Sequence, residues 1–209
     1  MKNIILSLLM VFSMVSSVKA DSKSGCELSQ VGDVKVSFKA YKTPSKIGVG
    51  GVFKSVKYTP IAPMGKNFRS ILVGSKVVID TTSVDSKNSG RDIKLVKFFF
   101  NMMSGKNIDA KITDIKADKK IKDAPRTGVV TIDVRMNGVT KSVPMKYSFS
   151  DGMFTAAGVV DILDFGAGKA LSSINRACFE LHKGKTWSDV SIGFSTKIEA
   201  LLCNAKPLK

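Results

Sequence analysis

The sequence has very few of the side chains that most often bind metals or carry catalysis. Its 209 residues include one histidine, His182, and three cysteines, Cys26, Cys178 and Cys203, whose spacing fits no zinc motif. Acidic residues number 17 against 33 lysines and arginines, and the sequence places no two of them for acid–base chemistry. We therefore expect a protein that is not an enzyme and that holds no metal or organic cofactor.

The single histidine lies at the end of a helical pattern. A Cys–His pair is available only with Cys178, four residues earlier, and α-periodicity alone accounts for that spacing. A histidine at a helix C-terminus interacts favourably with the helix dipole, and we expect this role for His182 rather than catalysis.

The chain also lacks linkers and membrane-spanning runs. It has six prolines, and no repeat or Pro/Gly/Ser-rich stretch divides it, which indicates one domain. Met1-Lys2-Asn3 precedes the uncharged residues 4–18, a run shorter than the roughly 20 apolar residues of a membrane span. With Val18-Lys19-Ala20 following, this pattern predicts a cleavable signal peptide over residues 1–20 and an exported mature domain over residues 21–209. An uncleaved anchor is the alternative interpretation.

The charge is strongly one-sided, with a formal net charge of +16. The lysines are spread along the predicted strands, and the one dense run, residues 116–122, falls in a predicted loop. This distribution is typical of a solvated strand face and does not indicate a nucleic-acid partner. Weak contact with anionic membrane surfaces is the second interpretation.

Alternation of apolar and polar residues is clearest over residues 129–149. Val130, Ile132 and Val134 alternate with polar residues before Asn137-Gly138, and the same period of two resumes after it. Asn-Gly between two alternating runs is the strongest short-range signal for a β-hairpin, because both turn residues need a positive φ.

Other segments extend the β pattern. Strands are predicted at residues 33–40, 47–58, 71–80, 108–115, 153–163 and 190–202, with a bend or bulge at Gly48, Gly50 and Gly51 and a polar stretch over residues 81–92. Helical spacing appears at residues 95–102 and 170–181, the latter closed by Lys183 and Gly184. The fold class is therefore all-β, with about eight antiparallel strands closing a barrel and one or two short helices.

Two cysteines flank this predicted barrel. Cys26 precedes the first strand and Cys203 follows the last. Closing a barrel makes those strands antiparallel neighbours, so we predict a Cys26–Cys203 disulfide in an exported protein, with Cys178 free and buried. This disulfide would close a long loop, and the chain-entropy model gives such a disulfide a stabilisation of roughly 4–5 kcal/mol.

Bulky apolar side chains are numerous on the inward phase of the strands. They either fill an eight-stranded barrel or line a pocket for one small apolar ligand. Each methylene that a ligand buries contributes roughly 0.8 kcal/mol, so an acyl or polyprenyl tail needs few polar contacts.

An ordered set of segments resembles the YceI-like family of exported polyisoprenoid-binding proteins. The segments cover nearly all of the mature chain: Val34–Phe38, Val49–Phe53, Val77–Val84, Gly90–Leu95 with Phe98-Phe99, Met136–Lys141, Val160–Gly166 and Val190–Phe194. The resemblance implies an eight-stranded, lipocalin-like barrel in the periplasm. It further implies that the interior holds an isoprenoid (a quinone or polyprenyl chain) or a fatty-acid-type lipid.

This family resemblance favours the ligand pocket over a filled core. We place the lipid tail on the apolar phase of the strands, with one further aromatic at the mouth. These candidate ligand-binding residues are Phe38, Phe53, Ile79, Phe99, Ile132, Val134, Met145, Tyr147, Phe154, Ile192 and Phe194. Arg91 or Arg176 is a candidate partner for the head group.

Two further hypotheses stay open from the sequence. The first is a cationic envelope-interaction or adhesion protein whose packed barrel is only a scaffold. The second is an integral outer-membrane barrel, for which one Trp and three Tyr are few for two aromatic girdles. We expect the protein to be a monomer or a homodimer, bound to an amphiphilic lipid.

Overall fold

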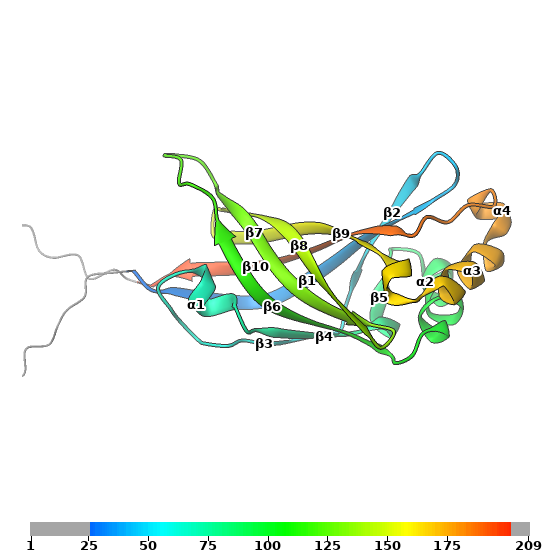
Figure 1. Ribbon diagram of the computed structural model, residues 1–209, viewed down its shortest axis with the longest axis horizontal. Helices are drawn as coiled ribbons and strands as arrows, with labels where there is room; N and C mark the ends of the chain where they lie inside the picture. The colour runs from blue at the N-terminus through cyan, green and yellow to red at the C-terminus, as the bar shows by residue number, and fades with distance from the viewer. Residues whose placement is uncertain (1–25, 202–209) are drawn as a thin grey trace, which may run out of the picture.

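The structure, a computed structural model, describes residues 26–201, which form an antiparallel sheet with short helices at its two ends (Figure 1). The predicted signal peptide and Cys203 lie outside these residues. The strands are β1 (Leu28–Lys42), β2 (Ile47–Phe53), β3 (Val56–Thr59), β4 (Lys76–Asp80), β5 (Val84–Asp85), β6 (Asn107–Ala117), β7 (Arg126–Met136), β8 (Val139–Ser150), β9 (Met153–Asp161) and β10 (Asp189–Ala200). The helices are α1 (Phe68–Leu72), α2 (Ser89–Phe98), α3 (Gly168–Ala177) and α4 (Phe179–His182), with 3₁₀ turns η1 (Thr81–Ser83), η2 (Phe100–Met102) and η3 (Ile162–Phe165).

The sheet curls into a half-barrel with strand order β3-β4-β6-β7-β8-β9-β10-β1-β2-β5. Its two edges meet where the chain passes from β2 to β3: Lys54 N–H donates to Ser83 O at 3.0 Å, and Asp80 N–H donates to Ser55 O at 3.1 Å. The all-β antiparallel prediction is confirmed. The predicted count of eight is wrong, since the described residues form ten strands and the short β3 and β5 make up the edges.

The hairpin predicted from alternation is present as β7 and β8. Met136 pairs with Val139, and the turn residues Asn137 and Gly138 have φ values of 52° and 78°. Positive φ at both positions is what a type I′ turn requires, and it suits the right-handed twist of the two strands.

Strand boundaries differ from the prediction around the glycine-rich segment. Residues 47–58 form two strands that lie far apart in the sheet: β3 is one edge strand, and β2 lies next to β5, the other edge strand. The register of β1 with β2 runs without a shift past Gly48, Gly50 and Gly51, so the predicted bulge is absent there. Register shifts occur instead between Val31 and Lys35 of β1 and between Ile112 and Asp114 of β6.

Several apolar residues assigned to strands belong to helices. Ile71 and Leu72 form the end of α1, so the predicted strand over residues 71–80 shortens to β4. The polar stretch over residues 81–92 contains η1, β5 and the start of α2, where the Asn88 side chain accepts a hydrogen bond from Arg91 N–H. The predicted helix over residues 170–181 divides at Cys178 into α3 and α4, and Lys183 and Gly184 end it with positive φ, as predicted.

The helices cover different ends of the half-barrel: α1 lies at one end, and α2, α3 and α4 gather at the other (Figure 1). At the α1 end, Leu28 of β1 pairs with Ala200 of β10, and Leu201 N–H donates to Glu27 O at 2.7 Å. The first and last strands are therefore antiparallel neighbours, as the disulfide prediction requires. The pairing with Cys203 stays a prediction, and Cys178 is a free, buried cysteine.

In the part of the chain from 26 to 201, no helix is long and apolar enough to cross a membrane. The same residues hold no group of three or more His, Cys, Asp or Glu side chains placed to bind a metal ion.

Candidate functional site

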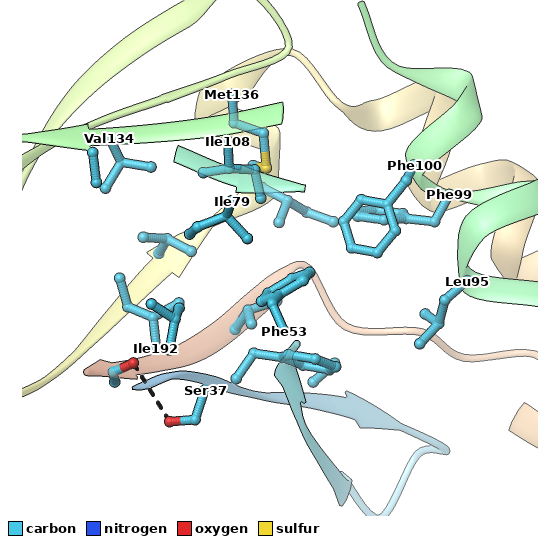
Figure 2. A pocket seen from close by; sticks show the side chains of 18 of the residues that line it. Ser37, Phe53, Ile79, Leu95, Phe99, Phe100, Ile108, Val134, Met136 and Ile192 are labelled. Atoms are coloured by element: carbon cyan, nitrogen blue, oxygen red, sulfur yellow. Dashed lines mark hydrogen bonds between the residues drawn. The ribbon is translucent and has the colours of Figure 1, made fainter. Parts of the chain in front are cut away.

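A cavity of about 590 Å³ lies inside the half-barrel and extends to the helices at its α2–α4 end. Its volume falls within the roughly 300–1,000 Å³ of small-molecule sites. Figure 2 shows Ile79, Ile108 and Val134 from one wall and Phe53 from the other pointing into a common space, with Phe99 and Phe100 approaching from the helical side.

Nine of the eleven predicted ligand-binding residues line this cavity. They are Phe38, Phe53, Ile79, Phe99, Ile132, Val134, Met145, Ile192 and Phe194. Eight of them lie on strands, and alternation accounts for these because every second side chain of a curled sheet points inward. The ninth, Phe99, lies at the end of α2. Their contact with a ligand stays a prediction.

Tyr147 and Phe154 do not line the cavity. Both are almost fully buried, and their rings stack with centroids 4.8 Å apart. Phe68 of α1 packs edge-on against Phe154 at 5.3 Å, so these rings form a packed floor at the α1 end. Alternation predicts which side chains point inward, but it carries no information on how far along the barrel the interior is already filled.

The floor also contains a polar atom without a partner. The Tyr147 hydroxyl is buried and, among the described residues, has no hydrogen bond, and burial raises its pKa above the usual value. An orphaned hydroxyl costs free energy, which the surrounding ring contacts offset.

Helical side chains complete the lining, and most of them were not predicted as ligand contacts. The helical and near-helical residues of this wall are Leu95, Phe100, Leu171, Ile174, Cys178 and Leu181. Their spacing of three and four residues was visible in the sequence, but a helix face packed on a core gives the same signal.

Hydroxyl groups in the cavity wall are already paired within the protein. Tyr58 donates to Ser75 Oγ at 3.0 Å, Tyr41 and Ser191 share a hydrogen bond of 2.8 Å, and Thr196 Oγ1 accepts from Gln30 at 2.8 Å. Burial raises the pKa of Tyr58, so it stays a neutral donor. Because these groups are satisfied, the barrel wall presents an essentially apolar surface.

Charged groups line the cavity chiefly at its helical end. Lys42, at the end of β1, and Arg91 and Lys94, on α2, all contribute to the lining there, whereas Arg176 does not. Arg176 lies on a separate shallow depression with Gly168 and Ser172. Of the two candidate arginines, only Arg91 therefore borders the cavity.

His182 lines the same end and is held in a chain of hydrogen bonds. Asn175 Nδ2 donates to Gly184 O at 3.2 Å, which orients Asn175 Oδ1 to accept from the Thr186 hydroxyl at 2.9 Å. Thr186 Oγ1 is then an acceptor for His182 Nδ1–H at 2.6 Å. Burial lowers the pKa of His182, and the positive charges of Lys42 and Lys94 lower it further. The neutral ring therefore carries its proton on Nδ1, leaving the Nε2 lone pair as an acceptor.

A curled antiparallel sheet around one large apolar cavity defines a lipocalin-like barrel. The chain belongs to the YceI-like family: the model of the YceI-like domain matches residues 28–200. This confirms the resemblance seen in the sequence.

Two solved structures share this fold. A polyisoprenoid binding domain from Saccharophagus degradans, implicated in plant cell wall breakdown, is 10% identical, with a TM-score of 0.55 over 85% of this chain and 99% of that chain. BcnA of Burkholderia cenocepacia is 17% identical, with a TM-score of 0.51 over 79% of this chain and 96% of that one. No curated protein matches the sequence.

Proposed function

We propose that this protein binds one isoprenoid (a quinone or polyprenyl chain) or fatty-acid-type lipid inside the half-barrel, for transport, storage or sequestration. The observation that carries the proposal is the apolar cavity of about 590 Å³, lined from both the sheet and the helices. Each methylene buried there contributes roughly 0.8 kcal/mol, so a chain of several carbons binds by its tail alone.

The comparisons support the same ligand class. The Saccharophagus degradans domain that shares the fold is described as polyisoprenoid binding. In this proposal the protein acts by binding rather than by catalysis and needs no cofactor besides the lipid.

Export is the second part of the proposal. The signal-peptide pattern of residues 1–20 supports delivery to the periplasm as a mature domain beginning at Asp21. A carrier in that compartment would hold a lipid that is otherwise confined to a membrane, as a monomer or as a homodimer.

The alternative function, a cationic adhesion protein with a packed barrel as scaffold, is less well supported. A packed barrel has no space at its centre, whereas the described residues enclose a large cavity.

The test is identification of the bound lipid after purification without detergent. An organic extract of the native protein should contain a stoichiometric apolar compound, detected by mass spectrometry. A protein that is empty after purification and also fails to bind added oleate or farnesol would overturn the proposal.

A matched pair of variants ties the lipid to the cavity. Ala110 of β6 lines the cavity, whereas Ala157 of β9 is exposed on the outer face. Ala110→Phe should occupy ligand space and remove most of the co-purifying lipid, while Ala157→Phe should retain it. Far-UV circular dichroism checks that both variants fold.

A further inference from the structure

The charge of the cavity lining is of one sign. The cations Lys42, Arg91, Lys94 and Lys111 line the cavity together with the neutral His182, whereas no Asp or Glu of residues 26–201 does. An apolar cavity for a neutral lipid gains nothing from bordering cations, because burying part of a lysine away from water costs free energy.

Lys42 and Lys94 come from separate elements that meet at the helical end. Lys42 lies at the end of β1, where it pairs with Thr186, the residue that hydrogen-bonds His182. Lys94 lies on α2, one turn after Arg91. Both lysines are half-buried, and neither forms an ion pair with a carboxylate of the described chain.

Arg91 differs from these two lysines in being held by its own neighbours. Its Nε donates to Ser86 Oγ at 2.7 Å, and Ser86 also hydrogen-bonds the Asp92 carboxylate. This network fixes Arg91 at the cavity edge and places an acid close to it. At the helical end, the two lysines therefore carry positive charge that no ion pair among the described residues compensates.

His182 responds to the same charge. Lys42 and Lys94 both disfavour its protonated form, which places the two lysines within electrostatic reach of one ring. A positive potential that opposes a further cation favours an anion by the same Coulomb interaction.

The mouth of the cavity lies at this end. Leu181 of α4 lines the cavity and is also 61% exposed, and the lining residues Asn88 and Gly90 at the start of α2 are exposed as well, which places the opening of the cavity beside α4 and α2. A lipid whose tail occupies the barrel would have its polar end here, between β1, α2 and α4.

We propose that Lys42 and Lys94 form a head-group subsite for an anionic lipid, with a carboxylate or phosphate bound at the helical mouth and the tail in the barrel. The inference rests on the proposed function, since it selects a charged class from the lipids that the cavity could take. A carboxylate or phosphate would accept charge-assisted hydrogen bonds from both lysines.

The test uses pairs of lipids that share a tail and differ in the head group, which is anionic in one member and a neutral hydroxyl in the other. Oleate is compared with oleyl alcohol, and farnesyl phosphate with farnesol, by displacement of the neutral fluorophore N-phenyl-1-naphthylamine from delipidated protein at pH 8. The wild type should bind the anion of at least one pair about tenfold or more tightly than its alcohol, since a charge-assisted hydrogen bond has at least that value.

One double variant tests whether Lys42 and Lys94 cause the preference for the anion over its alcohol, and a second double variant controls for the loss of net charge. Lys42→Gln with Lys94→Gln should bring the anion and its alcohol to equal affinity. The control is Lys39→Gln with Lys97→Gln, which changes exposed lysines on the same β1 and α2 that do not line the cavity. It should retain the preference.

The outcomes separate this inference from the proposed function. Equal affinity for anion and alcohol in the wild type, or a preference that survives the Lys42 and Lys94 changes, would overturn the head-group subsite and leave the lipid carrier standing. Failure of all four lipids to bind would overturn both. If only one of the two anions is preferred over its alcohol, that result identifies the head group of the natural ligand as a carboxylate or as a phosphate.

Discussion

At the scale of single residues, His182 offers a direct measurement of the mouth, because it is the only histidine in the chain. Burial, Lys42 and Lys94 lower its pKa from the usual 6.5, so its imidazole should titrate below 6.5 in a ¹H–¹⁵N NMR pH series. Lys42→Gln or Lys94→Gln should raise that pKa, and the exposed Lys97→Gln should leave it unchanged. A wild-type pKa at or above 6.5 would contradict the neutral ring.

The same shift has a consequence for stability. The unfolded chain binds the proton more readily than the folded chain, so the neutral His182 stabilises the fold above pH 6.5. That contribution is lost as the pH falls through the lower pKa of the folded state. A His182→Gln variant should therefore lose less stability than the wild type on acidification below pH 6.5, measured by urea unfolding.

Gly51 shows why one glycine in the β2 segment is required. A Cβ at Gly51 would lie 2.6 Å from Cζ of Phe38 and 3.0 Å from Asp85 O, whereas one at Gly50 meets only Phe38 O at 3.6 Å. Gly51→Ala should push Phe38 into the cavity and destabilise the fold by about 1–3 kcal/mol, as overpacking does. Gly50→Ala is the matched control, and equal urea midpoints for the two variants would refute the steric explanation.

The sequence predicted correctly which residues line the cavity wherever this depends only on the side of the strand to which a side chain points. Alternation predicted that Ile79, Ile132 and Val134 point inward, and they line the cavity. Tyr147 and Phe154 follow the same alternation, yet they lie in the floor because Phe68 of α1 packs against them. That contact joins residues about eighty positions apart, which no local pattern contains.

At the scale of elements, α1 is the clearest feature that the sequence concealed. Its five residues are too few to show helical periodicity, and Ile71-Leu72 followed by an apolar strand looks like one longer strand. The signal that was present is the cap: Asn67 accepts from Ser70 N–H at 2.9 Å, and the Ser70 hydroxyl accepts from Asn67 N–H at 3.2 Å.

This capping box supports a prediction for the floor. Asn67→Ala removes the acceptor for Ser70 N–H and should lower the free energy of unfolding by about 1 kcal/mol. Because Ile71 and Leu72 of α1 are fully buried, the loss should appear in global urea unfolding rather than only in local fraying. Lys66→Ala, one residue earlier and exposed, should change stability little. A similar loss in both variants would argue against the cap.

At the scale of the whole molecule, pairings between strands adjacent in the sequence were predictable, whereas the places of the other strands in the sheet were not. The β7–β8 pair follows from Asn137-Gly138 because its partners are adjacent in the chain. By contrast, β2 and β3 are separated by two residues and lie at opposite ends of the strand order, β3 at one edge and β2 beside the other edge strand β5. A continuous apolar stretch does not reveal that crossing. The cavity follows from the same closure, since its volume depends on how the edges and helices meet.

Exposed apolar side chains at the helical end bear on how a lipid would enter. Ile93 of α2 is 66% exposed and Phe179 of α4 is 55% exposed. Both helices lie at the end of the half-barrel where Leu181 borders the opening of the cavity. Lysines accompany them on α2 and just after α4, and the chain as a whole carries a net charge of +16. Apolar side chains beside cations match the surface of an anionic bilayer, where both can be accommodated. We therefore expect weak membrane contact through this end.

Vesicle binding tests that expectation. The protein should co-sediment with phosphatidylglycerol-containing vesicles more than with pure phosphatidylcholine, and added salt should weaken the binding because it screens surface charge. Ile93→Ser with Phe179→Ser should weaken vesicle affinity about thirtyfold or more, since each partly inserted side chain is expected to contribute roughly 1–2 kcal/mol. Ile121→Ser is the matched control, since Ile121 is 69% exposed in the loop between β6 and β7, at the α1 end and not at the end that carries α2, α3 and α4. If Ile121→Ser reduced binding as much, the contact would be spread over the surface rather than concentrated at the mouth, and lipid would have to enter without α2 and α4 touching the membrane.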